Sequence, residues 1–257
     1  MAFYKVIASG NVIEVYEYEK DTIKEISKKD DEKYNAYEKI VLEQDGSDWI
    51  HEKVDRSEER RKQTMREARN LTRRLTLMNF GQGDTFITLT YAENMQDIEK
   101  ADNDFKKFIQ RFKYRFKDLK YIAVREFQKR GAIHFHMICN WKKVFENEEQ
   151  IKECERWFAE NIWRHGFVDI KVMDGVDNVG AYLIKYMTKD IAIEAFKGKK
   201  AYLCSKGLDR PLEYRGEAAE AVLEAYGLKN KKEVFTNSYI SEYLGSVLYK
   251  EYNIKRL

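Results

Sequence analysis

The chain has 257 residues, enough for one large domain or for a core domain with extensions. Its 43% hydrophobic and 35% charged residues, with a single proline, indicate a globular protein rich in helices and strands. The 47 basic and 44 acidic residues leave a formal charge of +3, which excludes a histone-like cover of positive charge. Any nucleic-acid surface must therefore be a local patch.

Neither an export signal nor a membrane span is recognisable. Residues 1–21 alternate apolar and charged side chains, and no stretch approaches the roughly 20 apolar residues of a membrane-spanning helix. The cysteines Cys139, Cys154 and Cys204 are odd in number and lack CxxC spacing, so a disulfide framework or zinc knuckle is not expected. We expect a soluble, cytoplasmic protein with no membrane partner.

Residues 1–83 are predicted to form an N-terminal extension. Residues 3–8 and 12–18 alternate around a Ser-Gly-Asn turn, which predicts a β-hairpin. Residues 20–55 are polar and of mixed charge, and we interpret them as helical or partly mobile.

Residues 56–79 are predicted to form a basic amphipathic helix, with apolar side chains at spacings of three and four. Such a helix can simply pack on the main domain with its charges in water. Alternatively, its arginines contact DNA phosphates beside an active site. The candidate DNA contacts on this helix are Arg66, Arg69, Arg73 and Arg74.

Residues 84–190 show a regular succession of strands and helices. Strands are predicted at 85–91, 121–127, 133–139 and 167–173, and helices at 97–116, 148–164 and 176–189. This β-α-β-β-α-β-α order is the α+β, ferredoxin-like split βαβ plan with an antiparallel sheet and one added helix. Residues 191–257 are predicted to be a C-terminal helical extension, with a turn at 206–211 and helices near 216–227 and 238–251.

Two histidines on one strand, with a carboxylate opposite them, indicate a metal site. Strand side chains alternate faces, so His134 and His136 share one face, away from Ile133 and Phe135. The hairpin at 128–132 sets Glu126 opposite His134, which brings the carboxylate to the same face. Two imidazoles and a carboxylate suit a divalent cation, although an HxH pair on a strand can also be a pair of packing side chains. The other histidines, His51 and His165, have no such company.

The predicted helix at 176–189 carries two tyrosines, Tyr182 and Tyr186, four residues apart on one face. Lys185 and Lys189 form a parallel row beside them. Packing tyrosines and solvated lysines would give the same pattern. Beside a metal site, however, a phenol flanked by ammonium groups is a candidate nucleophile for a phosphodiester.

In this order, Phe86-Ile87-Thr88-Leu89-Thr90, Glu126 with His134-Phe135-His136, and Tyr182-Leu183-Ile184-Lys185-Tyr186 resemble the motifs of the HUH endonucleases. They most resemble the rolling-circle replication initiators of bacterial plasmids and single-stranded-DNA phages. The resemblance covers roughly residues 84–190, with a weaker similarity at 205–211.

The resemblance implies a site-specific, metal-dependent endonuclease that nicks single-stranded origin DNA and rejoins it through a 5′-phosphotyrosine intermediate. It implies that Glu126, His134 and His136 bind Mg²⁺ or Mn²⁺. By the same resemblance Tyr182 is the nucleophile, Lys185 its companion lysine, and Tyr186 the second tyrosine of the two-tyrosine phage-type initiators. Thr88 and Thr90 then lie near the DNA.

One departure from some members of the superfamily concerns unwinding. The sequence has no GxxxxGK[ST] motif, so we expect no helicase activity of its own. The resemblance to bacterial initiators implies that a host helicase and the host replication machinery are partners.

Several alternatives stay open at this stage. A transposase or relaxase would use the same chemistry, although relaxases usually carry three histidines and a tyrosine near the N-terminus. A non-catalytic single-strand binder could use the aromatic residues and the basic helix without metal. An iron oxygenase could also use two histidines and a carboxylate, but it would have no use for the tyrosine-lysine helix.

Overall fold

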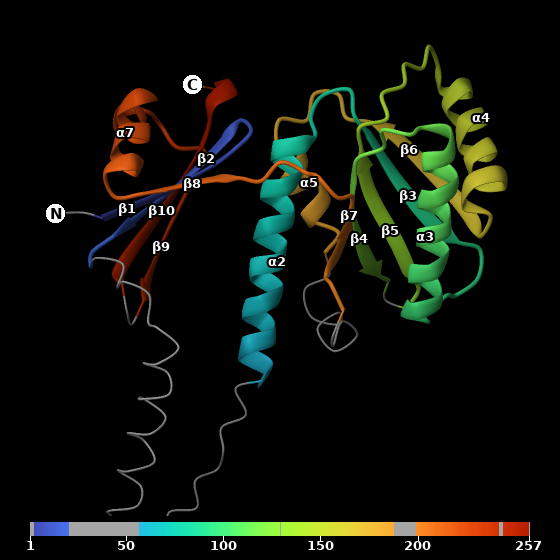
Figure 1. Ribbon diagram of the computed structural model, residues 1–257, viewed down its shortest axis with the longest axis horizontal. Helices are drawn as coiled ribbons and strands as arrows, with labels where there is room; N and C mark the ends of the chain where they lie inside the picture. Colours follow the sequence, from blue (N-terminus) through green and yellow to red (C-terminus); the bar gives the residue numbers. More distant parts are fainter. Residues whose placement is uncertain (1–2, 21–56, 129, 188–198, 242–243, 257) are drawn as a thin grey trace, which may run out of the picture.

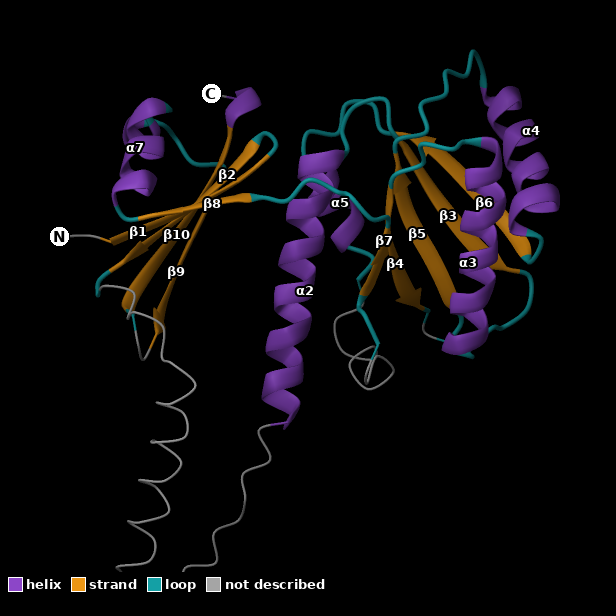
Figure 2. Ribbon diagram, viewed as in Figure 1, coloured by secondary structure: helices purple, strands orange, loops and turns teal. Residues whose placement is uncertain are grey.

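Two antiparallel sheets of five strands each make up this α+β fold, and helix α2 (Ser57–Asn79) stands between them (Figures 1 and 2). The computed structural model describes residues 3–20, 57–128, 130–187, 199–241 and 244–256, and the side chains from Arg61 onward in α2. The sheet of residues 85–204 is called the core sheet, and the sheet that contains the N-terminal hairpin is called the outer sheet.

The core sheet has the strand order β6-β3-β5-β4-β7. Its strands are β3 (Thr85–Tyr91), β4 (Tyr121–Phe127), β5 (Ile133–Cys139), β6 (Gly166–Val172) and β7 (Tyr202–Cys204). The helices that follow β3, β5 and β6 are α3 (Ile98–Arg115), α4 (Glu148–Phe158) with a π-helical turn (Ala159–Trp163), and α5 (Val179–Ile184). The predicted order of strands and helices is confirmed, and the first four strands have the neighbours expected of a split βαβ sheet.

The two faces of the core sheet are covered by different helices. Helices α3 and α4 cover one face, where Phe105, Phe135 and Trp163 belong to the main apolar core (Figure 1). Helices α2 and α5 lie against part of the other face, where Leu75 and Leu183 pack with strand residues such as Phe86. The rest of that second face carries the polar side chains described below.

The outer sheet joins the two ends of the chain, in the order β8-β1-β2-β10-β9. Its strands are β1 (Phe3–Ser9), β2 (Val12–Tyr18), β8 (Leu212–Arg215), β9 (Phe235–Ser241) and β10 (Gly245–Asn253). Helix α7 (Glu217–Ala225) packs on one face, and 3₁₀ turns follow at Leu228–Asn230 and Ile254–Arg256. The predicted hairpin and the predicted helix near 216–227 are confirmed.

The predicted helix at 238–251 is wrong, and the C-terminal segment is not a helical extension. Residues 235–241 and 245–253 are the two edge-side strands of the outer sheet, and β10 pairs with β2 from Val247↔Tyr18 to Asn253↔Val12. The strand is stabilised by pairing with residues more than 200 positions earlier, and local propensity contains no record of such a partner. The N- and C-terminal extensions therefore form one structural layer.

Helix α2 contacts both sheets closely. At Gly180 of α5, an added Cβ would lie 2.5 Å from the carbonyl oxygen of Arg73, so the α2–α5 crossing requires a glycine. The β1–β2 turn reaches the end of α2, where the amide of Gly10 lies 3.3 Å from the sulfur of Met78. Gly10 has φ 57°, a left-handed conformation that favours glycine.

Three sequence predictions fall on residues outside the described ranges. These are the helical or mobile segment within 21–56, His51, and the DNA contact by Lys189. Among the described helices, none has the length and apolar character required to cross a bilayer.

Candidate functional site

The candidate site lies on the polar part of the core sheet, where three neighbouring strands meet in register. Glu126 of β4 pairs with His134 of β5, as the hairpin spacing predicts. His134 and His136 in turn pair with Thr90 and Thr88 of β3. Paired residues of an antiparallel sheet share a face, so all five side chains project to the same side.

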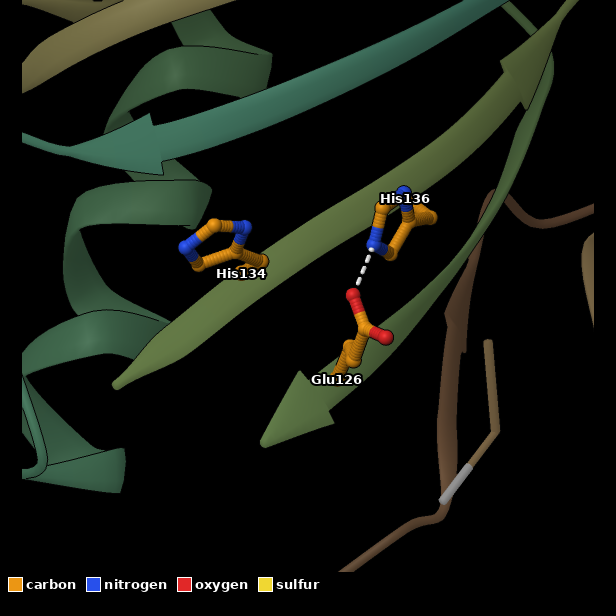
Figure 3. A group of neighbouring side chains, drawn as sticks. All are labelled: Glu126, His134 and His136. Carbon is orange, nitrogen blue, oxygen red and sulfur yellow. Dashed lines mark hydrogen bonds and ion pairs between the residues drawn. The ribbon is translucent and has the colours of Figure 1, made fainter. Parts of the chain in front are cut away.

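Glu126, His134 and His136 form a cluster suited to a metal ion. One potential ligand atom from each residue lies within 4.8 Å of the other two. The His136 Nε2 atom is 2.7 Å from the Oε2 atom of Glu126, the contact drawn in Figure 3. The carboxylate thus contacts the histidine diagonal to it, whereas its register partner is His134. Two nitrogen donors and one carboxylate suit divalent metals such as Mn²⁺, so the residues fit the expected cation.

Hydroxyl and amide groups hold the other ring nitrogens. Thr88 Oγ1 lies 3.2 Å from His136 Nδ1, and Thr90 Oγ1 lies 3.5 Å from His134 Nδ1. The Gln128 Nε2 atom is also 3.5 Å from His134 Nδ1. Outer partners of this kind fix the ring orientation and tautomer of a ligating histidine. The structure thus places both threonines against the histidines, beside the surface where the sequence predicts DNA.

Burial prepares the two imidazoles for metal binding. It lowers the pKa of His136, against the opposing effect of the Glu126 carboxylate, and it lowers the pKa of His134 as well. Neutral imidazole is the form that ligates a metal. The Glu126 side chain retains 34% exposure while that of His136 retains 5%, so the cluster is open to solvent on the carboxylate side.

Helix α5 brings the two tyrosines onto this face. The Tyr186 ring stacks on the His136 ring, with centroids 3.8 Å apart and planes at 18°. The Tyr182 ring packs edge-on against Phe86 at 4.9 Å, and the two tyrosine rings are 6.0 Å apart. The structure therefore brings Tyr182 and Tyr186 beside the cluster of Glu126, His134 and His136.

The helix that carries the tyrosines is shorter than predicted. α5 ends at Ile184, and Lys185 and Tyr186 lie in the turn that follows, where the Tyr186 amide donates to the carbonyl of Leu183. The spacing of four residues still places both rings on one side. Lys185 Nζ lies 3.7 Å from the centre of the Tyr182 ring and 4.8 Å from that of Tyr186. Lys185 thus contacts both phenol rings.

The two tyrosines differ in their surroundings. Burial, then Tyr182, Glu126 and Asp169, raise the pKa of the Tyr186 phenol well above its usual value. Tyr186 therefore stays protonated at neutral pH, with its ring held flat on a histidine of the cluster. Tyr182 is flanked by two ammonium groups, because Lys171 Nζ also lies 5.4 Å from its ring centre.

The predicted DNA contacts on α2 separate into two groups. Arg69 donates to the carbonyl of Met187 at 2.9 Å, while Arg73 and Arg74 form ion pairs with Glu14 of the outer sheet at 2.8 and 2.6 Å. These three guanidinium groups have partners within the fold. Arg66 is exposed and forms no ion pair with any described residue, which leaves it able to meet a ligand.

Two residues beside the site were missed in the sequence. Asp169 and Lys171 of β6 pair with Thr88 and Phe86, so they lie on the same face as the histidines. The alternation Phe167-Val168-Asp169-Ile170-Lys171 does place them on the polar side of their strand. The pairing of β6 with β3, which brings that side to the site, is not visible in the alternation.

Comparison with known proteins gives one family. Residues 84–191 match the family model of the replication-associated protein ORF2. The match spans the core strands β3 to β6 and α5, which include all members of the candidate site, and it indicates a protein of replication that binds DNA. No curated protein and no solved structure matches the chain.

Proposed function

We propose that this chain is a rolling-circle replication initiator that nicks and rejoins a DNA strand through a tyrosine, with Glu126, His134 and His136 as ligands of Mg²⁺ or Mn²⁺. One observation carries the proposal. Tyr182, Lys185 and Tyr186 contact one another beside the imidazole–carboxylate cluster, with the Tyr186 ring 3.8 Å from that of His136. The match of this segment to a replication-associated family supports it.

In the proposed reaction, the Tyr182 oxygen attacks the phosphorus of one phosphodiester. A bond forms between the phenol oxygen and phosphorus, and the bond from phosphorus to the 3′ oxygen breaks. The phenol proton passes to solvent, and the 3′ oxygen takes up a proton to become a free hydroxyl. The 5′-phosphate stays on the tyrosine. One phosphodiester replaces another, so the reverse attack by a 3′ hydroxyl rejoins the strand.

Each group on the face has a part in this reaction. A cation bound to the cluster supplies positive charge to a phosphate oxygen and makes the phosphorus more electrophilic. Lys185 and Lys171 attract the phosphate toward Tyr182, because both ammonium groups lie within 5.4 Å of its ring centre. Tyr186 holds His136 in place and offers a second hydroxyl for strand transfer. A separate helicase unwinds the duplex.

The order of attack follows from the surroundings of the two phenols. Tyr186 lies against a metal ligand, and burial raises the pKa of its phenol. Tyr182 packs only its ring edge on Phe86 and faces the lysines. We therefore assign the first cleavage to Tyr182.

The test is covalent capture. Single-stranded oligonucleotides that tile both strands of the DNA encoding the chain and its flanks are incubated with the protein and Mn²⁺. We expect one oligonucleotide to give a denaturation-resistant protein–DNA adduct, located on Tyr182 by mass spectrometry and abolished by EDTA. Tyr182→Phe should remove the adduct, and Tyr186→Phe, which preserves the stacked ring, should keep it.

Two results would refute the proposal. Adduct formation by the Tyr182→Phe, Tyr186→Phe double variant would exclude a tyrosine nucleophile. DNA binding that is unaffected by EDTA, with no adduct on any oligonucleotide, would favour a non-catalytic single-strand binder.

A further inference from the structure

A cleft of about 860 Å³ lies between the outer sheet and helices α2 and α5. Its volume is within the range of roughly 300–1,000 Å³ typical of pockets that hold one small ligand. Strands β2, β9 and β10 form one wall, and the middle of α2 and one side of α5 form the other. The lining side chains used below are Tyr16, Arg66, Asn70, Asn178, Phe235, Asn237, Tyr239 and Tyr249.

The sheet wall is aromatic. Phe235, Asn237 and Tyr239 alternate along β9 and so share the face of β10 that carries Tyr249. Phe235 and Tyr239 are 54% and 48% exposed, although large apolar rings are normally covered. The Phe235 and Tyr249 ring centres are 6.0 Å apart. This wall presents flat apolar surfaces to the cleft.

The rest of the lining is polar but nearly neutral. The carboxylates of Glu14 and Glu251 at the floor are paired with Arg73, at 2.8 and 2.5 Å. Amide side chains come from Asn70, Asn178 and Asn237, and Arg66 lies among the lining residues with no ion pair to a described residue. Rings with hydrogen-bonding amides and one cation suit a nucleobase attached to a phosphate better than they suit a phosphate alone.

The cleft adjoins the tyrosines through a single short helix. Ala181 and Ile184 of α5 line the cleft, whereas Tyr182 and Lys185 lie on the side of the core sheet. An α-helix with its side chains is only about 10–12 Å across. A DNA strand at Tyr182 can therefore continue around α5 into the cleft.

We infer that this cleft binds unpaired bases of the DNA strand that flanks the cleavage point, by stacking them on Phe235 and Tyr239 and hydrogen bonding them to the asparagines. The inference rests on the proposed function for its link to cleavage. It assigns the outer sheet, which lies outside the family match, to the selection of the DNA substrate.

The test measures binding without chemistry. The probe is a fluorescein-labelled dT20 single strand in EDTA, read by fluorescence anisotropy, with an abasic 20-mer of the same backbone as the second probe. Stacking tolerates any base, so dT20 is a sufficient ligand. We expect Phe235→Ala with Tyr239→Ala to raise the Kd for dT20 by about tenfold or more. The Kd for the abasic strand should not change, because that strand has nothing to stack.

The matched control is Ile240→Ala. Ile240 neighbours Tyr239 on β9, is 88% exposed, and does not line the cleft, so its loss should leave both affinities unchanged. If circular dichroism shows that the double variant is unfolded, Tyr239→Ala alone replaces it.

Three outcomes would overturn the inference. One is an unchanged Kd for dT20 in the double variant. Another is an equal loss for dT20 and the abasic strand, which would indicate a backbone effect. The third is an equal loss in the Ile240→Ala control. Failure of the nicking proposal is read separately, because it removes the Tyr182 adduct while the dT20 result in EDTA stands.

Discussion

The core sheet and the outer sheet have the same number of strands, yet they contact α2 in different ways. Against the core sheet and α5, α2 buries apolar side chains such as Leu75 and Leu77, and Gly180 permits close approach. Against the outer sheet, α2 places Arg73 and Arg74 on the buried carboxylate of Glu14.

The difference separates two kinds of joint. An apolar joint depends on shape, and its cost grows with the volume of an added or lost group. An ionic joint depends on complete pairing, because a buried charge that loses its partner is strongly destabilising. The family match includes most of the core sheet and α5 but neither α2 nor the outer sheet. The chemistry therefore belongs to one sheet, and the other sheet is attached to it by α2.

The greatest loss should come from a change in the chemistry of the core sheet. His136→Ala removes a proposed metal ligand and the surface on which Tyr186 stacks. Adduct formation should fall by more than the roughly 10–100-fold that a lost outer partner of a metal ligand costs. Adduct rates with Mn²⁺ and Mn²⁺ affinity by calorimetry measure the change. His165→Asn, outside the cluster, should retain both, and an equal loss there would contradict the assignment.

The ionic joint is tested by Glu14→Gln, which leaves Arg73 and Arg74 without their shared carboxylate. The side chain of Glu14 is only 2% exposed, so we expect a loss of about 3 kcal/mol in the free energy of unfolding, measured in urea. Glu213→Gln is the control on the same sheet. Glu213 pairs with Lys5 at 42% exposure and should cost less than about 1 kcal/mol. Equal losses would show that the buried network has no special weight.

The same pair of proteins has a predicted pH dependence. Burial tends to raise the pKa of Glu14, but the hydrogen bond from Arg74 and the charge of Arg73 outweigh it and lower the pKa below its ordinary value of 4.5. The unfolded chain therefore binds this proton more readily than the folded chain. The stabilisation is present above pH 4.5 and is lost as the pH falls through the lower, folded-state pKa. The stabilities of wild type and Glu14→Gln should converge below about pH 4.

The apolar joint is tested by Gly180→Ala. The added Cβ would lie 2.5 Å from the Arg73 carbonyl and 3.0 Å from Leu77 Cγ, so α5 must move away from α2. We expect a loss of about 2 kcal/mol in unfolding free energy, and slower adduct formation because Tyr182 follows closely along α5. Gly81→Ala is the control, since an added Cβ there has no neighbour within 4 Å. Full adduct formation by the Gly180 variant would show that α5 need not be fixed by α2.

A more modest change concerns the hydroxyl behind a histidine. Thr88→Val keeps the shape but removes the Oγ1 atom that lies 3.2 Å from His136 Nδ1. Mn²⁺ affinity should fall about tenfold, because the ring loses the partner that fixes its tautomer. Thr236→Val removes a hydroxyl that donates to the Tyr249 carbonyl in the outer sheet, and Mn²⁺ affinity should be unaffected. No change in the Thr88 variant would mean that His136 is held by Glu126 and Tyr186 alone.

Local patterns along the chain were enough to predict the core strands and the cluster of Glu126, His134 and His136. Strand alternation and a short hairpin loop are local properties, and together they specify which side chains share a face. The same local reasoning placed Tyr182 and Tyr186 on one side of their helix, although it made that helix too long.

The remaining features depend on the assembled fold. Folding places residues 245–253 beside the N-terminal hairpin, sets Arg73 and Arg74 on Glu14, turns Glu126 toward His136, and brings Asp169 and Lys171 to the site. Each of these depends on which distant segments become neighbours. The free energy of such pairings comes from burial and contacts that form only in the folded chain, so no local pattern records them.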